Sequence, residues 1–150
     1  MHRGPDGRPV VPVRMLYSSM MSAGVFIRLD GKRQVSTKSE SNLPGLMTIV
    51  GTAPLTLFLP GTDKEPPWDV DLQQGVNPNG GEAVCVIRPI FYEWEIRPTF
   101  QIDLRVFGEK AARELVDIAG RRMGVGSFRP SRRGTYGQYV VAVWDVQNRN

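Results

Sequence analysis

The feature that most constrains the fold is a strict alternation of apolar and polar residues between positions 93 and 105. The apolar positions are Trp94, Ile96, Phe100, Ile102 and Leu104, and the residues that alternate with them are all charged or polar. Pro98 occupies the remaining position of the apolar series. A period of two predicts a β-strand over 93–104 with one buried face and one solvated face. The proline indicates a sheet edge or a bulge at that point.

Two amphipathic helices accompany this strand. Val13, Leu16, Tyr17 and Met20 follow each other at helical spacing, which predicts a helix over 12–23 that begins near Pro12 and ends at Gly24. An alanine- and leucine-rich stripe that ends at Gly120 predicts a second helix over 109–119. Shorter strands are expected at 25–29, 34–36, 46–50, 55–59, 82–90 and 136–146.

Strands and helices follow each other without regular alternation, which predicts an α+β fold with a mainly antiparallel sheet, two helices and long loops. The β-α-loop-β order over 93–146 resembles half of a ferredoxin-like, RNA-recognition-type fold. A length of 150 residues fits a single domain. Residues 1–9 are expected to be a flexible arm and 60–81 a long acidic loop. Because the chain opens in what reads as the middle of a strand-loop-helix unit, an N-terminal strand is expected to be missing or supplied by a partner.

The counts of cysteine and histidine exclude several classes of site. Cys85 and His2 are the only residues of their kinds. No intramolecular disulfide, zinc cluster or histidine-based nucleophilic mechanism can be built from them. Cys85 is expected to be an inert buried thiol and Trp68 an anchor on the core. The acids Glu65, Asp69 and Asp71 are interpreted as a solvated loop and not as a metal site, so no cofactor and no catalysis are predicted.

No membrane span or secretory signal is expected. The apolar runs fall far short of the ~20 residues needed to cross a bilayer, and no apolar segment follows the charged N-terminus. The chain is therefore predicted to be soluble and cytoplasmic.

The segment with the strongest functional signal is residues 121–139, RRMGVGSFRPSRRGTYGQY, called the Arg/Gly loop below. It contains five arginines, four glycines and three aromatic residues and no acid. Arginine forks bind phosphates, glycines let a ligand approach the backbone, and aromatic rings stack on bases. The predicted nucleic-acid-binding residues are Arg121, Arg122, Gly124, Gly126, Phe128, Arg129, Arg132, Arg133, Gly134 and Tyr136. A solvated loop whose glycines serve only turn geometry is the alternative interpretation.

A helix, a glycine- and arginine-rich loop and a closing strand that begins with an aromatic residue resemble the C-terminal part of the repeat-associated RNA-binding superfamily of CRISPR systems. The phrase GVGSFRPSRRGTYGQY is also similar to segments of uncharacterised phage and prophage proteins. The resemblance covers about residues 93–146, with weaker support from the helix PVRMLYSSMMSAG. It implies a ferredoxin-like fold, RNA binding, and a bacterial or phage-infected host cell.

The leading hypothesis is a non-enzymatic protein that binds single-stranded nucleic acid, with RNA favoured over DNA, alone or in a larger ribonucleoprotein assembly. The alternative is a phage or prophage assembly component that forms homo-oligomers through its sheet edge and its Gly/Pro-rich segments. An endoribonuclease is a third possibility, and it would have to use tyrosine, lysine or carboxylate groups.

Overall fold

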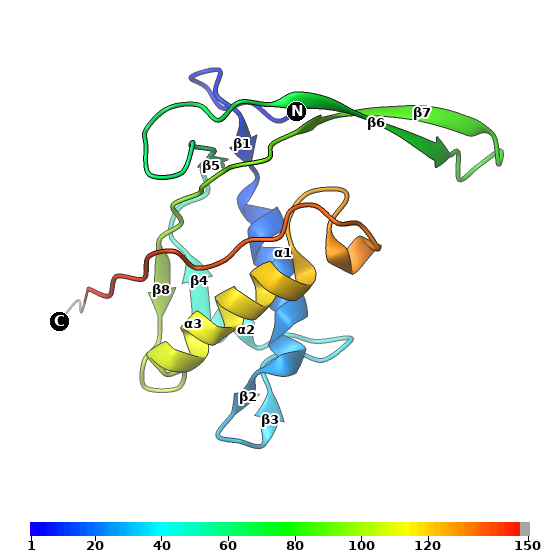
Figure 1. The fold of residues 1–150 in the computed structure, drawn as a ribbon. Coiled ribbons are helices and arrows are strands. Elements are labelled where there is room, and N and C mark those ends of the chain that lie inside the picture. Colours follow the sequence, from blue (N-terminus) through cyan, green and yellow to red (C-terminus); the bar gives the residue numbers. More distant parts are fainter. Residues whose placement is uncertain (148–150) are drawn as a thin grey trace. The chain divides into compact units, whose positions relative to one another are not determined.

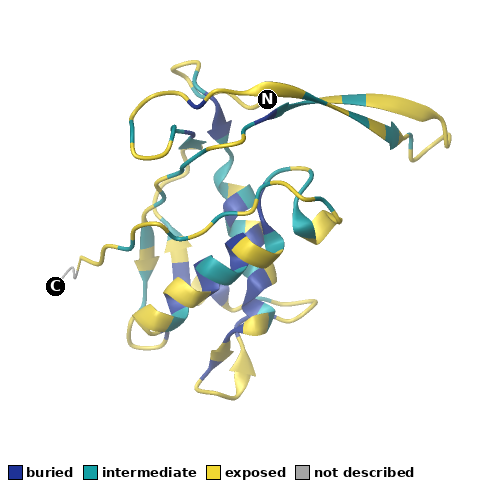
Figure 2. Ribbon diagram, in the orientation of Figure 1, coloured by how far each residue is buried: buried dark blue, intermediate teal, exposed yellow. Residues whose placement is uncertain are grey.

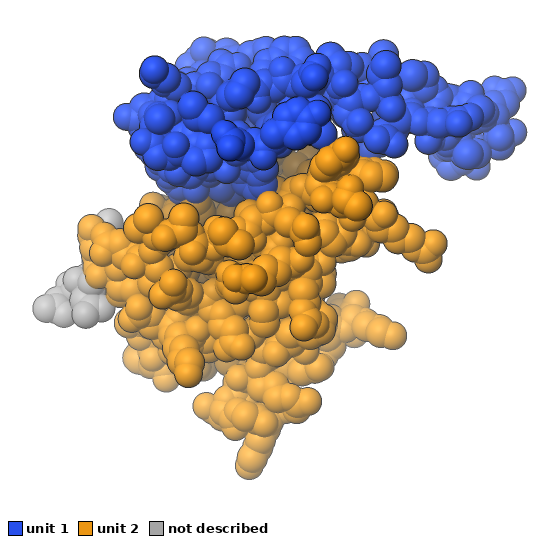
Figure 3. Space-filling model, viewed as in Figure 1, with its two compact units in different colours: residues 1–11, 54–97 blue, residues 12–53, 98–150 orange. Residues whose placement is uncertain are grey.

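The structure is a computed structural model that describes residues 1–147, and it divides the chain into two compact units (Figure 3). Unit 1 contains residues 1–11 and 54–97, and unit 2 contains residues 12–53 and the chain from Pro98 onward. The elements of both are labelled in Figure 1. Each unit is described by itself.

Unit 1 is built from short antiparallel pairings. Strand β1 (Val10–Val11) pairs with β5 (Leu55–Thr56), and the N–H of Leu57 extends this contact by donating to the carbonyl oxygen of Pro9 at 2.9 Å. A further bridge joins Phe58 to Glu95. Residues 1–9 form a turn closed by a bridge between Arg3 and Pro9, so the segment expected to be a flexible arm is internally hydrogen-bonded.

The longest strands of unit 1 form a single hairpin. β6 (Asp69–Val76) and β7 (Ala83–Ile90) pair antiparallel over their whole length, from Asp69 opposite Ile90 to Val76 opposite Ala83. The strand predicted over 82–90 is confirmed as β7. The acidic loop predicted over 60–81 is wrong in its second half, because β6 occupies it. Figure 2 shows that most of this ribbon is exposed.

Unit 2 carries the helices. α1 (Val13–Ala23) and α3 (Glu109–Ile118) confirm the two predicted helices and contact each other. Their apolar faces supply much of the core, in which Leu16, Met20 and Leu115 are almost fully buried. Phe107, which lies just before α3, is the largest of the fully buried side chains. Leu16 and Met20 lie one helical turn apart and Leu115 comes from the predicted stripe, so the spacing that predicted the helices also selected core residues.

Several small elements complete unit 2 between the helices. β2 (Arg28–Leu29) and β3 (Arg33–Gln34) form a short hairpin that overlaps the strands predicted over 25–29 and 34–36, although residues 24–26 are a 3₁₀-helix and not the start of a strand. The short helix α2 (Leu43–Leu46) leads into β4 (Met47–Ile49), which pairs antiparallel with β8 (Phe100–Ile102).

The α+β class is confirmed, but the sheets are smaller than predicted. Among residues 1–147 every sheet has two strands. The alternation over 93–104 produces only β8 and the isolated bridge at Glu95. The closing strand predicted over 136–146 is wrong, since this segment joins no sheet. β4 and β5 do not pair with each other, because their partners are β8 and β1.

Two single-residue expectations are also wrong. Cys85 lies on the hairpin and is exposed, so it is not a buried thiol. Trp68 is 44% exposed and does not anchor the core. Both residues lie at or beside the β6–β7 hairpin, and its exposure accounts for both errors.

Candidate nucleic-acid interface

The Arg/Gly loop begins in a π-helical turn that continues α3. The π-helix Ala119–Met123 carries Arg121 and Arg122, and it ends at Gly124 with a φ of 67°. π-helical turns within helices recur at functional sites. The Ser19 hydroxyl of α1 donates to the carbonyl oxygen of Ala119 at 3.2 Å, which fixes this turn on the core of unit 2.

The rest of the loop folds back on itself. The N–H of Val125 donates to the carbonyl oxygen of Gly137, and the N–H of Tyr136 donates to that of Phe128, both at 2.9 Å. A 3₁₀-turn over Pro130–Arg132 lies between these two contacts. The loop is therefore a hydrogen-bonded protrusion of defined geometry, with residues 129–135 at its tip.

Close packing within the loop explains why several of its glycines are glycine. A Cβ at Gly134 would lie 2.0 Å from the carbonyl oxygen of Phe128, and one at Gly137 would lie 1.8 Å from that of Val125. A Cβ at Gly124 would meet the Pro130 ring at 2.8 Å. At Gly124 and Gly134 the protein itself occupies the space that a ligand was expected to use. Gly126 differs, because nothing lies within 4 Å of its added Cβ.

The two predicted stacking residues contact each other. The rings of Phe128 and Tyr136 are 5.8 Å apart at their centroids and inclined by 46°. Phe128 is half-buried and Tyr136 is 40% exposed. This pair braces the two sides of the loop and leaves part of the Tyr136 ring open to a base.

Three of the five arginines are engaged within unit 2. Arg121 forms an ion pair with Asp117 at 2.8 Å, and the guanidinium of Arg122 lies 4.7 Å from the centre of the Phe26 ring. Arg129 donates to the carbonyl oxygen of Gly126 at 2.6 Å and to the Ser131 hydroxyl at 2.9 Å. Arg129 therefore holds the tip of the loop in shape.

Arg132 and Arg133 are the two arginines that remain available. Both are exposed, and neither forms an ion pair with any residue in 1–147. Arg133 has a φ of 61°, which places it at the end of the 3₁₀-turn in a left-handed conformation. The turn thus presents two adjacent guanidinium groups at the tip of the protrusion.

Charge is divided unequally between the units. The described part of unit 2 has 13 lysines and arginines against 7 aspartates and glutamates, whereas unit 1 has 5 against 8. The basic surplus of the chain therefore belongs to the unit that carries the Arg/Gly loop. A polyanion is attracted to unit 2 and repelled by unit 1.

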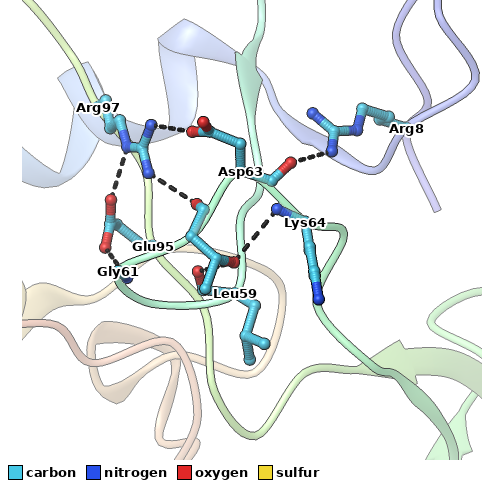
Figure 4. Close-up of polar contacts among 8 residues, drawn as sticks. Arg8, Leu59, Gly61, Asp63, Lys64, Glu95 and Arg97 are labelled. Atoms are coloured by element: carbon cyan, nitrogen blue, oxygen red, sulfur yellow. Dashed lines mark hydrogen bonds and ion pairs between the residues drawn. The ribbon is translucent and has the colours of Figure 1, made fainter.

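Sequence reasoning did not single out an ionic cluster in unit 1 (Figure 4). Arg97 bonds to Glu95 at 2.6 Å and to Asp63 at 2.7 Å, and Glu95 also accepts from the N–H of Gly61 at 2.9 Å. The hydrogen bonds from Arg97 and from the N–H of Gly61 lower the pKa of Glu95. The hydrogen bonds to Glu95 and Asp63 raise the pKa of Arg97. The alternation placed Glu95 and Arg97 on a wet face but gave no sign of the distant Asp63.

Phe58 lies beside this cluster and contacts two cations. The guanidinium of Arg97 is 4.4 Å from the centre of its ring and that of Arg8 is 5.3 Å away. Arg8 also donates to the backbone carbonyl of Asp63. Arg97 and Arg8 are therefore both engaged within unit 1, by carboxylates, a backbone carbonyl group and the Phe58 ring.

Within residues 1–147, no group of three or more histidine, cysteine or acidic side chains converges to hold a metal ion. No helix in the same residues has the length and apolarity that a membrane crossing requires.

Comparison with known proteins gives no relative. No protein-family model matches the chain, and neither a curated protein nor a solved structure does.

Proposed function

We propose that this protein binds single-stranded nucleic acid, RNA in preference to DNA, through the Arg/Gly loop of unit 2, without catalysing a reaction. The observation that carries the proposal is the pair Arg132 and Arg133, which are exposed, adjacent and unmatched by any acid among the described residues. Two exposed arginines at the tip of the loop, on a unit with a basic surplus, suit a phosphate backbone.

The roles of the other loop residues follow from their contacts. Arg121 and Arg122 are held at one end of the loop and can add phosphate contacts by releasing Asp117 or Phe26. Gly126 gives a ligand access to the backbone, and the exposed part of Tyr136 offers a stacking face. Gly124, Phe128, Arg129 and Gly134 act indirectly, since they shape the loop. The proposal depends on this loop and not on a ferredoxin-like sheet.

Salt dependence gives the sharpest test. Each phosphate neutralised on a single strand contributes ~0.7 to the slope of log K against log salt, so Arg132→Ala with Arg133→Ala should reduce that slope by ~1.4. Fluorescence anisotropy of a labelled single-stranded RNA, measured at two salt concentrations, reports it. Arg105→Ala is the matched control, because Arg105 is an exposed arginine of unit 2 that pairs with Asp103 at 2.8 Å.

The outcomes separate the hypotheses. Weaker binding by the double variant, with binding by Arg105→Ala unchanged, supports the loop as the site. Absence of binding at low salt, or equal binding by the double variant and the wild type, overturns the proposal. Single-stranded DNA and duplex RNA of equal length test the preference for RNA, and intact RNA after incubation excludes the endoribonuclease.

Homo-oligomeric assembly is the second candidate function, as expected of a phage or prophage structural component. The observation that favours it is independent of the loop, since it lies on the β6–β7 hairpin of unit 1.

A further inference from the structure

The two faces of the β6–β7 hairpin differ in chemistry. Residues directly opposite each other in an antiparallel pair share a face, so the register assigns every side chain of the hairpin. One face carries Asp69, Asp71, Gln73 and Arg88 and is mixed. On the other face every residue except Gln74 is apolar: Val70, Leu72, Gln74, Val76, Ala83, Cys85, Ile87 and Pro89.

This apolar face is open to solvent. Val70 is 52% exposed, Leu72 65%, Val76 69% and Ile87 68%. An isolated two-stranded hairpin is only marginally stable in water, and it needs more strands or a cover over its apolar face. No other described residue of unit 1 provides that cover for these four side chains. A contiguous apolar patch of this kind marks an interaction surface.

The outer edge of β6 is also free to pair. The N–H of Asn77 donates to the carbonyl oxygen of Glu82 at 2.9 Å, so these two residues form a hydrogen-bonded pair beside the turn. Hydrogen-bonded and non-hydrogen-bonded pairs alternate along an antiparallel ladder, so Val76 and every second residue before it belong to non-hydrogen-bonded pairs. The backbone groups of Val70, Leu72, Gln74 and Val76 therefore point away from β7. β6 lacks two of the usual protections of an edge strand, because its sequence DVDLQQGV contains no proline and no lysine, and its only charged residues are Asp69 and Asp71 near one end. β7 is protected at the corresponding edge by Pro89, which has no N–H to donate.

The edge of β6 is complementary to itself. A two-fold axis at Gln73 places Val70 opposite Val76 of a second copy and Leu72 opposite Gln74 of that copy. In this register each residue of the apolar face lies opposite another residue of the apolar face, so the apolar faces of the two hairpins join on the same side of the sheet. Asp71 then lies opposite Gly75, and Asp69 opposite Asn77, so no acid faces another acid.

The area of the face decides how many copies are needed. Eight residues at ~3.3 Å and two strands at ~4.8 Å give a face of ~250 Å² in plan, so two single hairpins packed face to face bury ~500 Å². A stable interface buries ~1,200 Å² or more. When two edge-paired hairpins form a four-stranded sheet and two such sheets pack face to face, the buried area doubles to ~1,000 Å². This value treats each face as flat, and the side chains that project from it add further buried area.

We propose that the β6–β7 hairpin is a self-association arm whose partner is a second copy of this chain. Two copies pair antiparallel through β6, and the joined apolar face of one pair packs on the same face of another pair. The assembly is a tetramer, four times the 16.7 kDa mass of the chain. It does not depend on nucleic-acid binding, because it uses no residue of the Arg/Gly loop.

Sedimentation velocity over a range of concentrations tests the arm. Gln74→Pro removes an outward N–H and leaves the ladder with β7 intact, so it should reduce the wild-type tetramer to monomer. Gln74→Thr keeps that N–H and should remain tetrameric. Leu72→Lys places a charge on the apolar face and should stop assembly at the edge-paired dimer. Val84→Lys adds the same charge on the other face, on β7 and so away from the β6 edge, and should remain tetrameric.

Circular dichroism before the runs establishes that each variant is folded. If Gln74→Pro does not fold, the comparison of Leu72→Lys with Val84→Lys still decides whether the copies assemble through the apolar face. A wild-type chain that is monomeric at every concentration overturns the proposal. An oligomer that survives both Gln74→Pro and Leu72→Lys also overturns it, since another surface would then hold the copies together.

Discussion

Gly137→Ala tests whether the Arg/Gly loop is held by the close backbone contact described above. Gly137 has a φ of 76°, and a left-handed conformation costs an L-residue ~1–2 kcal/mol. The new Cβ would also lie 1.8 Å from the carbonyl oxygen of Val125, so the two chain segments must separate. Separation breaks the hydrogen bond from the N–H of Val125, which is worth ~1 kcal/mol. The expected destabilisation is ~2–3 kcal/mol.

Gly126→Ala is the matched control, because Gly126 has a φ of 87° and no neighbour within 4 Å of the added Cβ. It should cost only the conformational term of ~1–2 kcal/mol. Urea unfolding measures both variants. Tryptophan fluorescence follows the unfolding. If Trp68 and Trp94 of unit 1 are replaced by phenylalanine in every protein compared, the signal comes from Trp144 and reports on unit 2. Equal destabilisation by the two substitutions would refute the role of the close contact.

Two further predictions concern pH. The Arg97 and Gly61 hydrogen bonds lower the pKa of Glu95, so their stabilisation is present above its ordinary pKa of 4.5 and is lost as the pH falls through the lower value of the folded state. Glu95→Gln should flatten the acid limb of the pH-stability curve of unit 1, and an unchanged limb contradicts this. Burial raises the pKa of Tyr139 from 10.0 to about 12, so unit 2 should lose stability as the pH rises through that interval. Tyr139→Phe should remove much of this loss in urea titrations between pH 9 and 11.5, and a wild-type slope in the variant would count against it.

The helices could be predicted because their signals are local. The apolar stripes of 12–23 and 109–119 lie within single elements bounded by Pro12, Gly24 and Gly120, and both are found within one residue of the predicted bounds. β7 was predicted from its apolar run. β6 was not predicted because its acidic residues and the turn sequence NPNGG that follows it are typical of a loop. Val70, Leu72 and Val76 nevertheless have the spacing of residues on one face of a strand.

The strands that failed depend on distant partners. Residues 93–104 have the period of a long strand, but the chain changes units between Arg97 and Pro98, so the two halves pair with different segments. The final segment has strand composition, yet Tyr139 packs on Gly120 and its N–H donates to the carbonyl oxygen of Gly120 at 3.2 Å. A helix end therefore takes the place of a neighbouring strand. Nothing local to either segment indicates which partner it meets.

The composition of the Arg/Gly loop indicated the residues of the candidate site but not which of them are held by other parts of the protein and which remain available to a ligand. Five arginines read alike in sequence, whereas in the structure Asp117, Phe26 and Gly126 engage three of them and two stay available. The glycines read as ligand access, and only Gly126 among the three predicted has open space. Gly137, which the prediction omitted, makes the closest contact of the loop.

The two proposals respond to salt in opposite directions, which makes them separable in one titration. Nucleic-acid binding by the basic unit 2 weakens as salt rises, because the release of counterions no longer favours it. Assembly through the hairpin buries uncharged side chains and brings together acidic copies of unit 1, so added salt screens their repulsion and preserves or strengthens association. A chain that lost both properties together as salt rose would be assembling on the nucleic acid itself, and the hairpin would then have no independent role.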